Sequence, residues 1–463
     1  MVRSGSDPSP TTPVVSRRAA LTGGVLAAAS GAAAVGVVVN RDHETSAPPA
    51  GTSDTAFNVR DFGAVGDGDA DDTAKIQAAI DAARETGGIV FLPPGTYLTR
   101  RLTLYSRIHL RGAGGDATVL KLFPGANSAI IESDGFSKLT GTASDGGTTM
   151  FSIRDLTLDG NKSRNADGGF GLRLYSYGYE ISDVIAYNCK NDGIFSEWGT
   201  SSALPPPSHQ MEARLSGIRS HENDGHGVNF AGPHDSMFLN CLAFQNRGTG
   251  FRMSANSAGS LMVNCHAWGM EQNISFDLAA GHLSCMNCYA DLNGGVGVRI
   301  SRNGVKWIGG MVLGYNYAGP GDEIGIQFVA GPKRGEPTGS IIDTKIVNCG
   351  TAAVDFGAEQ GASSVRANLS LPGAKDKQGK VIPGSGRGWI GTPAATTQVE
   401  LFGGVGDTGK NLVIRPAFDL RVQATPPPPD ADTVRIFVRK EGGKTQVCAL
   451  FPGGAVQVMA TEP

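Results

Sequence analysis

The sequence lacks an excess of charge of either sign, and it has few stretches that would form helices. Its 463 residues include 40 Lys and Arg against 43 Asp and Glu, a net charge of -3. So small a charge provides no basic field for nucleic acid and no reason to expect an acidic partner. Nothing in the composition argues for a membrane protein. One solenoid with small appendages or several globular domains would both suit this length.

The sequence also lacks a disulfide framework. It has seven cysteines, an odd number, so at least one is unpaired within a monomer. Cys285-Met286-Asn287-Cys288 is a CxxC motif, but a zinc site would need a second pair at similar spacing, and none is present. No Asp-rich loop has the spacing of a calcium site. We therefore predict no metal site and no cofactor, with Ca²⁺ as the one ion left open.

What the sequence does have is glycine and a short repeat. Glycine accounts for 66 residues, which suits many short strands joined by tight turns. An apolar-Asn-Cys pattern returns after 24, 23 and 61 residues. Its copies are Leu239-Asn240-Cys241, Val263-Asn264-Cys265, Met286-Asn287-Cys288 and Val347-Asn348-Cys349. Self-similarity at this period, in strands and turns without helices, predicts an all-β fold, a parallel β-helix.

Stacked coils should place like residues of successive copies above one another, because neighbouring strands lie about 4.8 Å apart. Cys241, Cys265 and Cys288 would then form one buried column, and the asparagines would form a parallel amide ladder. In this register the cysteine column continues through Asp155, Asp183, Gly217, Gly310 and Cys349. We interpret both columns as structural.

The first forty residues predict a targeting segment. Arg17 and Arg18 precede residues 20–39, an uncharged run of Ala, Gly and Val. Twin arginine before a weakly apolar run resembles a twin-arginine export signal, so we expect a secreted protein that has no membrane association after export. The alternative is an N-terminal membrane anchor, since about 20 apolar residues can span a bilayer. Residues 41–56 would be a linker.

The folded part opens with a long motif. Residues 57–68 read Phe-Asn-Val-Arg-Asp-Phe-Gly-Ala-Val-Gly-Asp-Gly, and Asp71-Asp72-Thr73 can cap a helix that follows. The apolar stripe of that helix would be Ile76, Ala79, Ile80 and Ala83. A buried strand over residues 89–92 and a turn over residues 93–97 come next. The run from Val59 to Tyr97 resembles the N-terminal signature of the pectate-lyase-like superfamily.

This resemblance implies a right-handed parallel β-helix, here over residues 57–372, with the helix covering one open end. The superfamily includes polygalacturonase-like and rhamnogalacturonase-like hydrolases, alginate C5-epimerases and phage tailspike depolymerases. Residues 154–161 also resemble the epimerase and polygalacturonase-like members. The partner that the resemblance implies is an extracellular polysaccharide.

The repeat decays towards the C-terminus. Residues 373–425 are predicted to be a Gly-rich region with occasional strands, and residues 426–429 a stiff Pro spacer. Residues 430–463 predict a small β-hairpin module with turns at Gly442-Gly443 and Gly453-Gly454. This module resembles C-terminal modules of phage-related tail proteins, so both a homotrimer and a monomer stay open.

Aligning the coils on the glycine that opens the second strand of each predicts which side chains face outward, because side chains alternate along a strand. The first outward column reads Arg173, Phe195, Asn229, Arg252, Ser275 and Arg299. The second reads Tyr175, Glu197, Ala231, Ser254, Asp277 and Ser301. Aromatic rings mixed with Arg and Glu have the composition of a sugar-binding groove. We predict that Arg173, Tyr175, Trp198, His234, Asp235 and Arg252 bind substrate.

The densest polar cluster flanks this face and supplies the predicted catalytic residues Glu197, Asp224, His226 and Asp192. Hydrolysis of a glycosidic bond needs two carboxylates, which Glu197 and either aspartate would supply. A lyase or epimerase needs a base and a cation beside a uronate carboxylate, roles open to His226 and Arg252. Asp192 and Asp224 also precede turn glycines, so ordinary turn chemistry is the alternative for both.

The family motifs are only partly present. Asn191-Asp192-Gly193 and residues 224–227 resemble fragments of the polygalacturonase pattern, whose Asp-Asp coil is missing. The epimerase motif Tyr-Gly-Phe-Asp-Pro-His-Glu corresponds to residues 192–198, which lack its Tyr, Asp and His. Our leading hypothesis is therefore an exported hydrolase that cleaves a polysaccharide. A uronan lyase or C5-epimerase is the first alternative, and a non-catalytic glycan-binding or tailspike-like adhesin is the second.

Overall fold

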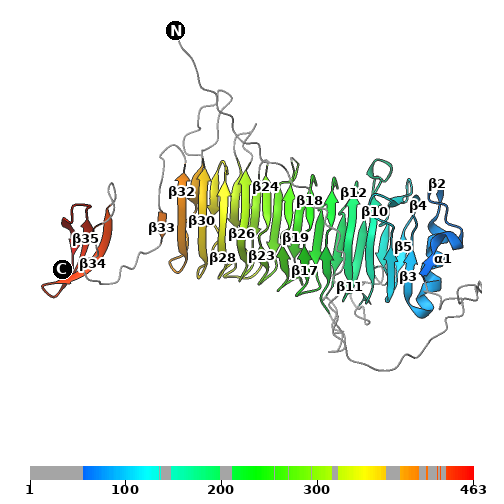
Figure 1. The fold of residues 1–463 in the computed structure, drawn as a ribbon, viewed down its shortest axis with the longest axis horizontal. Coiled ribbons are helices and arrows are strands. Elements are labelled where there is room, and N and C mark those ends of the chain that lie inside the picture. Colours follow the sequence, from blue (N-terminus) through cyan, green and yellow to red (C-terminus); the bar gives the residue numbers. More distant parts are fainter. Residues whose placement is uncertain are drawn as a thin grey trace, which may run out of the picture. The chain divides into compact units, whose positions relative to one another are not determined.

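The structure is a computed structural model, and it describes residues 56–134, 136, 147–198, 211–254, 256–269, 271–292, 295–314, 322–371, 386–405, 413–415, 425, 428 and 434–462. The predicted targeting segment and all but the last residue of the linker lie outside these residues, as does most of the Pro spacer. Nearly all described elements are strands (Figure 1). No described helix is long and apolar enough to cross a membrane.

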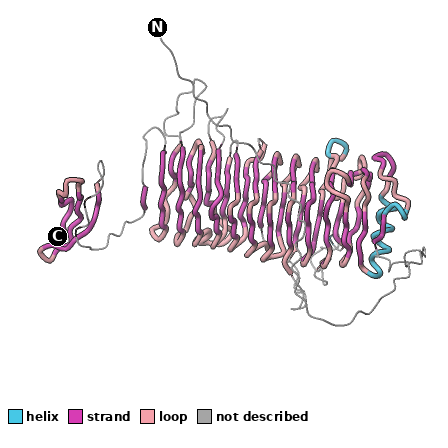
Figure 2. Tube along the Cα trace, viewed as in Figure 1, coloured by secondary structure: helices cyan, strands magenta, loops and turns pink. Residues whose placement is uncertain are grey.

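The strands of the described chain form two long sheets whose members pair almost entirely in parallel (Figure 2). The first sheet has 21 strands: β1 (Ala56–Asn58), β2 (Asp67–Asp71), β3 (Gly88–Phe91), β4 (Gly95–Thr99), β6 (Ile108–Arg111), β7 (Thr118–Leu122), β10 (Ser152–Asp159), β12 (Glu180–Tyr187), β14 (Arg214–Ser216), β15 (Arg219–His221), β17 (Met237–Leu239), β18 (Leu242–Phe244), β20 (Leu261–Val263), β21 (His266–Trp268), β23 (Ser284–Met286), β24 (Tyr289–Leu292), β26 (Lys306–Gly314), β28 (Ile341–Val347), β30 (Ser364–Leu371), β32 (Gln398–Val405) and β33 (Val413–Arg415).

The second sheet has 12 strands: β5 (Leu102–Leu104), β8 (Ile131–Ser133), β9 (Thr148–Thr149), β11 (Leu172–Tyr177), β13 (Ile194–Glu197), β16 (Val228–Ala231), β19 (Thr249–Ser254), β22 (Ile274–Ala279), β25 (Val296–Ile300), β27 (Ile324–Phe328), β29 (Ala352–Asp355) and β31 (Arg387–Ile390). Each coil of the chain adds strands to the first sheet and then one to the second. This is the predicted parallel β-helix.

The end of the stack is covered by α1 (Thr73–Thr86), which follows the short 3₁₀ helix η1 (Val59–Phe62). The predicted apolar stripe is correct: Ile76, Ala79, Ile80 and Ala83 are all fully buried. Asp72 does occupy the N-cap position, but its carboxylate does not cap the helix. It accepts hydrogen bonds from the backbone N–H groups of Val65 and Gly66, at 2.7 and 2.9 Å, and so holds the opening loop against the helix.

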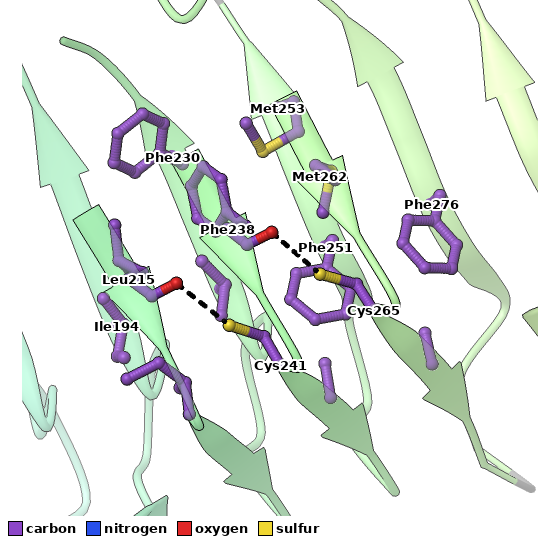
Figure 3. Packing of buried hydrophobic residues seen from close by; sticks show 14 of the residues in the cluster. Ile194, Leu215, Phe230, Phe238, Cys241, Phe251, Met253, Met262, Cys265 and Phe276 are labelled. Atoms are coloured by element: carbon purple, nitrogen blue, oxygen red, sulfur yellow. Dashed lines mark hydrogen bonds between the residues drawn. The ribbon is translucent and has the colours of Figure 1, made fainter. Parts of the chain in front are cut away.

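The cysteine column is buried as predicted, since Cys241, Cys265 and Cys288 are all 1% exposed or less. The thiols of Cys241 and Cys265 point at the backbone carbonyl groups of Leu215 and Phe238 (Figure 3). The predicted register of this column was one residue out. The pairing continues the cysteines into earlier coils through the buried apolar residues Ile218, Val184 and Leu156.

The asparagines, not the cysteines, share a column with Asp155, Asp183 and Gly217. Every member of this column has a positive φ; the values at Asn240, Asn264 and Asn287 are 53°, 53° and 52°. Asn, Asp and Gly are the residues that adopt this left-handed conformation at least cost. The column therefore marks the corner at which each coil from β10 to β26 bends within the first sheet.

The fourth copy of the repeat, Val347-Asn348-Cys349, lies at a different corner. Val347 pairs with Leu313 at the end of β28, just before the chain enters the second sheet. Asn188 and Cys189 occupy the equivalent place after β12, and Asn188 also has a positive φ of 56°. Relative to the other three copies, this copy therefore lies half a coil further along the chain. The 61-residue spacing alone did not reveal this difference.

The parallel pairing continues past residue 372, where the β-helix was predicted to end. β31 pairs with β29, and β32 pairs with β30 along its whole length. The predicted irregular region at 373–425 therefore contains at least one further coil. The predicted hairpin module is present as the antiparallel strands β34 (Arg435–Glu441), β35 (Lys444–Leu450) and β36 (Val456–Thr461). Phe437, Cys448 and Leu450 form its core.

The left-handed corner can be tested at Asn264, whose amide donates a 3.3 Å hydrogen bond to Asn240. We expect Asn264→Ala to lower the free energy of unfolding by about 1 kcal/mol, because Ala lacks the short polar side chain that lets Asn adopt this φ at little cost. Asn264→Gly removes the same hydrogen bond without the strain and should change stability by only a few tenths of a kcal/mol. Urea unfolding followed by circular dichroism measures both. Equal loss in the two variants would assign the corner's stability to the amide ladder instead.

Candidate functional site

The predicted site residues divide between two edges of the second sheet. Asp192, Asp224 and His226 precede strands β13 and β16, whereas Glu197 ends β13 and His234 follows β16. Five residues of extended chain span about 16 Å, which is the separation between Asp192 and Glu197 along β13. The structure thus brings together two groups of predicted residues rather than one.

Asp192 is part of the connection between neighbouring coils. Its side chain is buried, and one carboxylate oxygen accepts a hydrogen bond from the backbone N–H of His226 at 2.7 Å. The other oxygen accepts from the side-chain amide of Asn229 at 2.9 Å. Both contacts fix the turn of the next coil, which is the structural role left open from the sequence.

Asp224 lies among three cations. Its carboxylate is 3.2 Å from Lys162, 3.0 Å from Lys190 and 3.3 Å from Arg247, and only 14% of the side chain is exposed. Burial by itself would raise the pKa of Asp224, but the hydrogen bonds and charges of Lys190, Lys162 and Arg247 outweigh it and lower the pKa. Asp224 is therefore ionised at neutral pH and joins three coils electrostatically.

His226 is held as a neutral ring. The backbone N–H of Thr249 donates to its Nδ1 at 2.8 Å, so the proton of the neutral imidazole lies on Nε2. Burial is the main cause that lowers the pKa of His226; Asp192 opposes this effect and Arg252 adds to it. Nε2 lies 3.5 Å from a guanidinium nitrogen of Arg252. In this arrangement His226 can donate a hydrogen bond next to Arg252, whereas its basic nitrogen is occupied.

Arg252 belongs to a trio on the outer face of the second sheet. Asp277 lies between Arg252 and Arg299 in register, 3.8 Å from the first guanidinium and 2.7 Å from the second. Its side chain is 5% exposed, while those of Arg252 and Arg299 are 43% and 35% exposed. The sequence placed Asp277 in the second outward column, with Glu197 and Ser254, and this was wrong. The coil had been aligned on Asn273 in place of the opening glycine, whereas the residue that corresponds to Gly250 is Ser275, two positions later.

A second trio of the same kind was not predicted. Glu132 on β8 is 3.3 Å from both Arg101 and Arg173, and its side chain is 8% exposed. The guanidinium of Arg173 also lies 4.0 Å above the ring of Phe136. In each trio two partly exposed arginines share one buried carboxylate, so the trio as a whole has one net positive charge. No sequence motif marks Glu132 or Asp277; only the register of the coils pairs them with arginines.

At the other edge, the aromatic residues predicted to bind sugar are buried. Tyr175 and Trp198 are 1% and 2% exposed and pack with Tyr177, so their rings do not offer open faces for stacking. Glu197 is only half-buried, and its carboxylate has no hydrogen bond or ion pair with the described residues. It stays a candidate for chemistry at this edge.

His234 and Asp235 form a pair beside Glu197. Nδ1 of His234 lies 2.6 Å from the carboxylate of Asp235, and the imidazole ring lies 6.1 Å from that of Trp198. A carboxylate only accepts hydrogen bonds, so Nδ1 carries the proton and Nε2 is left as the basic nitrogen. A carboxylate that orients a histidine in this way is a common arrangement for general-base chemistry. The structure thus gives His234 a capacity beyond substrate binding.

Metal binding finds no support in the described part of the chain, where no three His, Cys, Asp or Glu side chains gather as a metal site would require. The described cysteines are all buried thiols without disulfides. Proton transfer and charge neutralisation are chemistry that the carboxylates, histidines and arginines described above can provide.

Comparisons with known proteins agree with this parallel β-helix. A family model described as rhamnogalacturonase A/epimerase, pectate lyase-like, matches residues 56–275. The A-module of mannuronan C-5 epimerase AlgE6 from Azotobacter vinelandii has a similar structure, with a TM-score of 0.53, 22% sequence identity, and coverage of 76% of this chain and 99% of that one. Over residues 56–275, a little under half of its length, the chain is therefore similar to pectate-lyase-like proteins, and its fold is that of the parallel β-helix.

Two curated relatives come from the same organism. Mannuronan C5-epimerase AlgE1 is 30% identical over 243 residues, which are 43% of this chain and 16% of the relative. Alginate lyase 7 is 32% identical over 216 residues, 43% of this chain and 24% of the relative. The chain thus spans about a quarter or less of the length of these two relatives.

The structural role of Asp224 gives a prediction. Asp224→Asn should destabilise the protein by about 1 kcal/mol at neutral pH, because it leaves three cations without their shared anion. Because the pKa of Asp224 is lower in the folded than in the unfolded protein, its charge stabilises the folded state above the unfolded pKa of about 3.9. This stabilisation is lost as the pH falls through the pKa of the folded state. The difference between variant and wild type should therefore vanish in acid, as measured by thermal unfolding from neutral to acidic pH.

Glu271→Gln is the matched control, because Glu271 also pairs with Arg247, at 3.0 Å, but both side chains are more than half exposed. It should cost less than about 0.5 kcal/mol. An Asp224→Asn variant no less stable than this control would contradict the structural role.

Proposed function

We propose that the protein binds a uronate-containing polysaccharide along the outer face of the second sheet and removes the proton at C5 of a bound uronate. The observation that carries this proposal is the pair of trios in which two arginines share one buried carboxylate. The predicted export signal in residues 1–40 would bring the protein to an extracellular polymer of this kind.

The trios favour a polyanion over a neutral glycan. Each arginine uses part of its planar donor set on the buried carboxylate and keeps further N–H donors at the surface, where a second carboxylate can bind side-on. Arg173 and Arg252 are three strands apart, about 14 Å, so they would contact different sugar residues of one chain. The glycan would then run along the stacking direction of the coils.

Hydrolysis was the leading hypothesis from the sequence, but the structure does not place the two carboxylates that it needs close together. Asp192 and Asp224 are held by their coils, and Asp192 lies about 16 Å along the sheet from Glu197. Glycosidases place their two carboxyl groups about 5–9.5 Å apart. Chemistry that needs one base and a cation fits the arrangement better.

Removal of the C5 proton needs the uronate carboxylate to be neutralised, because negative charge develops there as the proton leaves. Arg173 would provide this stabilisation, because β11 lies beside β13 and places Arg173 one strand and two residues, about 8 Å, from Glu197. Arg252 and the Nε2–H of His226 would hold the carboxylate of another sugar residue of the same chain. Glu197 or Nε2 of His234 would accept the proton. If the C4–O bond then breaks, a C4–C5 double bond forms and the chain is cleaved; if a proton returns to the opposite face of C5, the product is the epimer.

The names of the relatives support both outcomes, since they include mannuronan C5-epimerases and an alginate lyase. One relative favours the non-catalytic alternative. Plasmin and fibronectin-binding protein A of Streptococcus pneumoniae is 40% identical over 125 residues, which are 25% of this chain and 17% of that protein. Binding without turnover is therefore an outcome that the experiment must be able to reveal.

Solvent exchange tests the proposed reaction directly. Incubation of the protein with polymannuronate, polyguluronate or polygalacturonate in D₂O should introduce deuterium at C5 or produce unsaturated uronates, seen by NMR and by ultraviolet absorbance. Neutral glucans should give neither. New reducing ends without unsaturation or deuterium would show hydrolysis and contradict the proposal. Binding of a uronan with no chemical change would instead identify a glycan-binding protein.

The roles of individual residues separate by substitution. Arg173→Gln should reduce the exchange rate by about 100-fold or more, because it removes a donor that acts on developing charge, and Arg173→Lys should recover part of the loss. Of Glu197→Gln and His234→Gln, the variant of the true base should abolish exchange. Asp224→Asn is the control, and its rate should stay within a few-fold of wild type. Full activity in Arg173→Gln would remove the trio around Glu132 from the mechanism.

A further inference from the structure

A second groove crosses the outer face of the first sheet, on coils near the capped end. One part has a volume of about 410 Å³ and is lined by residues that include Arg107 and Arg214. An adjoining part of about 220 Å³ is lined by residues that include Arg111 and Arg154. The two parts share His109 and Ser152, so they form one continuous depression.

The register of four strands builds this groove. His109 on β6, Ser152 on β10, Glu180 on β12 and Arg214 on β14 lie opposite one another in successive coils. Two residues further along, Arg111 and Arg154 are paired in the same way. Because side chains alternate along a strand, all of these residues face outward. The residues come from four separated stretches of sequence, so no local motif announced them.

The groove is cationic. Its four arginines face one acidic lining residue, Glu180, and Asp155 lies 3.7 and 3.8 Å from Arg111 and Arg154. Arg107 and Arg214 form no ion pair or side-chain hydrogen bond within the described part of the chain, and both are exposed. Two guanidinium groups at one depression, with their donors unused, are suited to an anion.

Apolar surface adjoins these charges. Met150 is 50% exposed and lines the larger part of the groove, and Ile89 is 37% exposed and lines the smaller part. Between them the ring of His109 is hydrogen-bonded through Nδ1 to the hydroxyl of Ser152 at 2.9 Å. A sugar ring that carries an acidic group presents both an apolar C–H face and anionic oxygens, which is the combination this surface would complement.

We propose that this groove is a second glycan-binding site, which holds an acidic sugar residue through its carboxylate or sulfate oxygens on Arg107 and Arg214. It lies on a different sheet from Arg252 and does not depend on the proposed reaction there. The acidic sugar has two sources: a distant stretch of the same uronan, or a separate sulfated glycan.

Binding measurements in a background that lacks the other cationic face test the proposal. Full-length protein carrying Arg173→Gln, Arg252→Gln and Arg299→Gln is titrated calorimetrically with an oligouronate, a heparin-derived oligosaccharide and neutral maltohexaose. Adding Arg107→Gln and Arg214→Gln should weaken binding of an acidic oligosaccharide roughly tenfold or more. Adding Arg219→Gln and Lys345→Gln, which remove the same charge from exposed positions of the first sheet outside the groove, should change it less than about twofold.

The result with each oligosaccharide identifies the source. Groove-dependent binding of the oligouronate indicates a second stretch of the uronan, and groove-dependent binding of the heparin fragment alone indicates a separate glycan; either supports the site. Equal weakening by the groove pair and the control pair would overturn it, because only general charge would then matter. Equal affinity for maltohexaose, or no binding of any acidic oligosaccharide in the background protein, would overturn it as well. Unchanged circular dichroism and melting temperature confirm that each variant is folded.

Discussion

The structure depends on a backbone ladder that turns at the same place in the successive coils from β10 to β26. In these coils each corner bends the chain in the same way, and the left-handed residues in the column of Asp155, Asp183, Gly217, Asn240 and Asn264 do this in the first sheet. A corner shifted by one residue would turn every following side chain to the opposite face. The short side chains at this corner therefore determine which residues are core and which are surface.

The register set by these corners also determines the candidate chemistry. It lines up Arg252, Asp277 and Arg299 on adjacent strands, so that a carboxylate that is only 5% exposed serves two arginines. The same register keeps Asp192 far from Glu197, although both belong to one short stretch of sequence. A strand separates its two ends by its full length, so closeness in sequence is a poor guide to a shared site in this fold.

The sequence predicted the parts that local pattern controls. The repeat, the apolar stripe of the capping helix and the C-terminal hairpins were all correct, because each rests on periodicity or on turn residues within a few positions. It could not predict what depends on pairing between coils. The Asn and Cys columns were one residue out, the copy at Asn348 belongs to another corner, and Asp277 was placed in the wrong outward column. Loop lengths set these alignments, and nothing in the side-chain pattern reports them. Glu132 and the groove around Arg107 and Arg214 were missed for the same reason.

The central claim is that the outer face of the second sheet recognises uronate carboxylates through arginines that share a buried acid. A crystal structure of the Glu197→Gln variant soaked with an oligouronate tests this most directly. The account predicts a sugar carboxylate within hydrogen-bond distance of Arg252 and of Nε2 of His226, with the chain running towards Arg173. An oligouronate bound with no carboxylate at Arg252, or absent from this face at concentrations where solution binding is saturated, would contradict it.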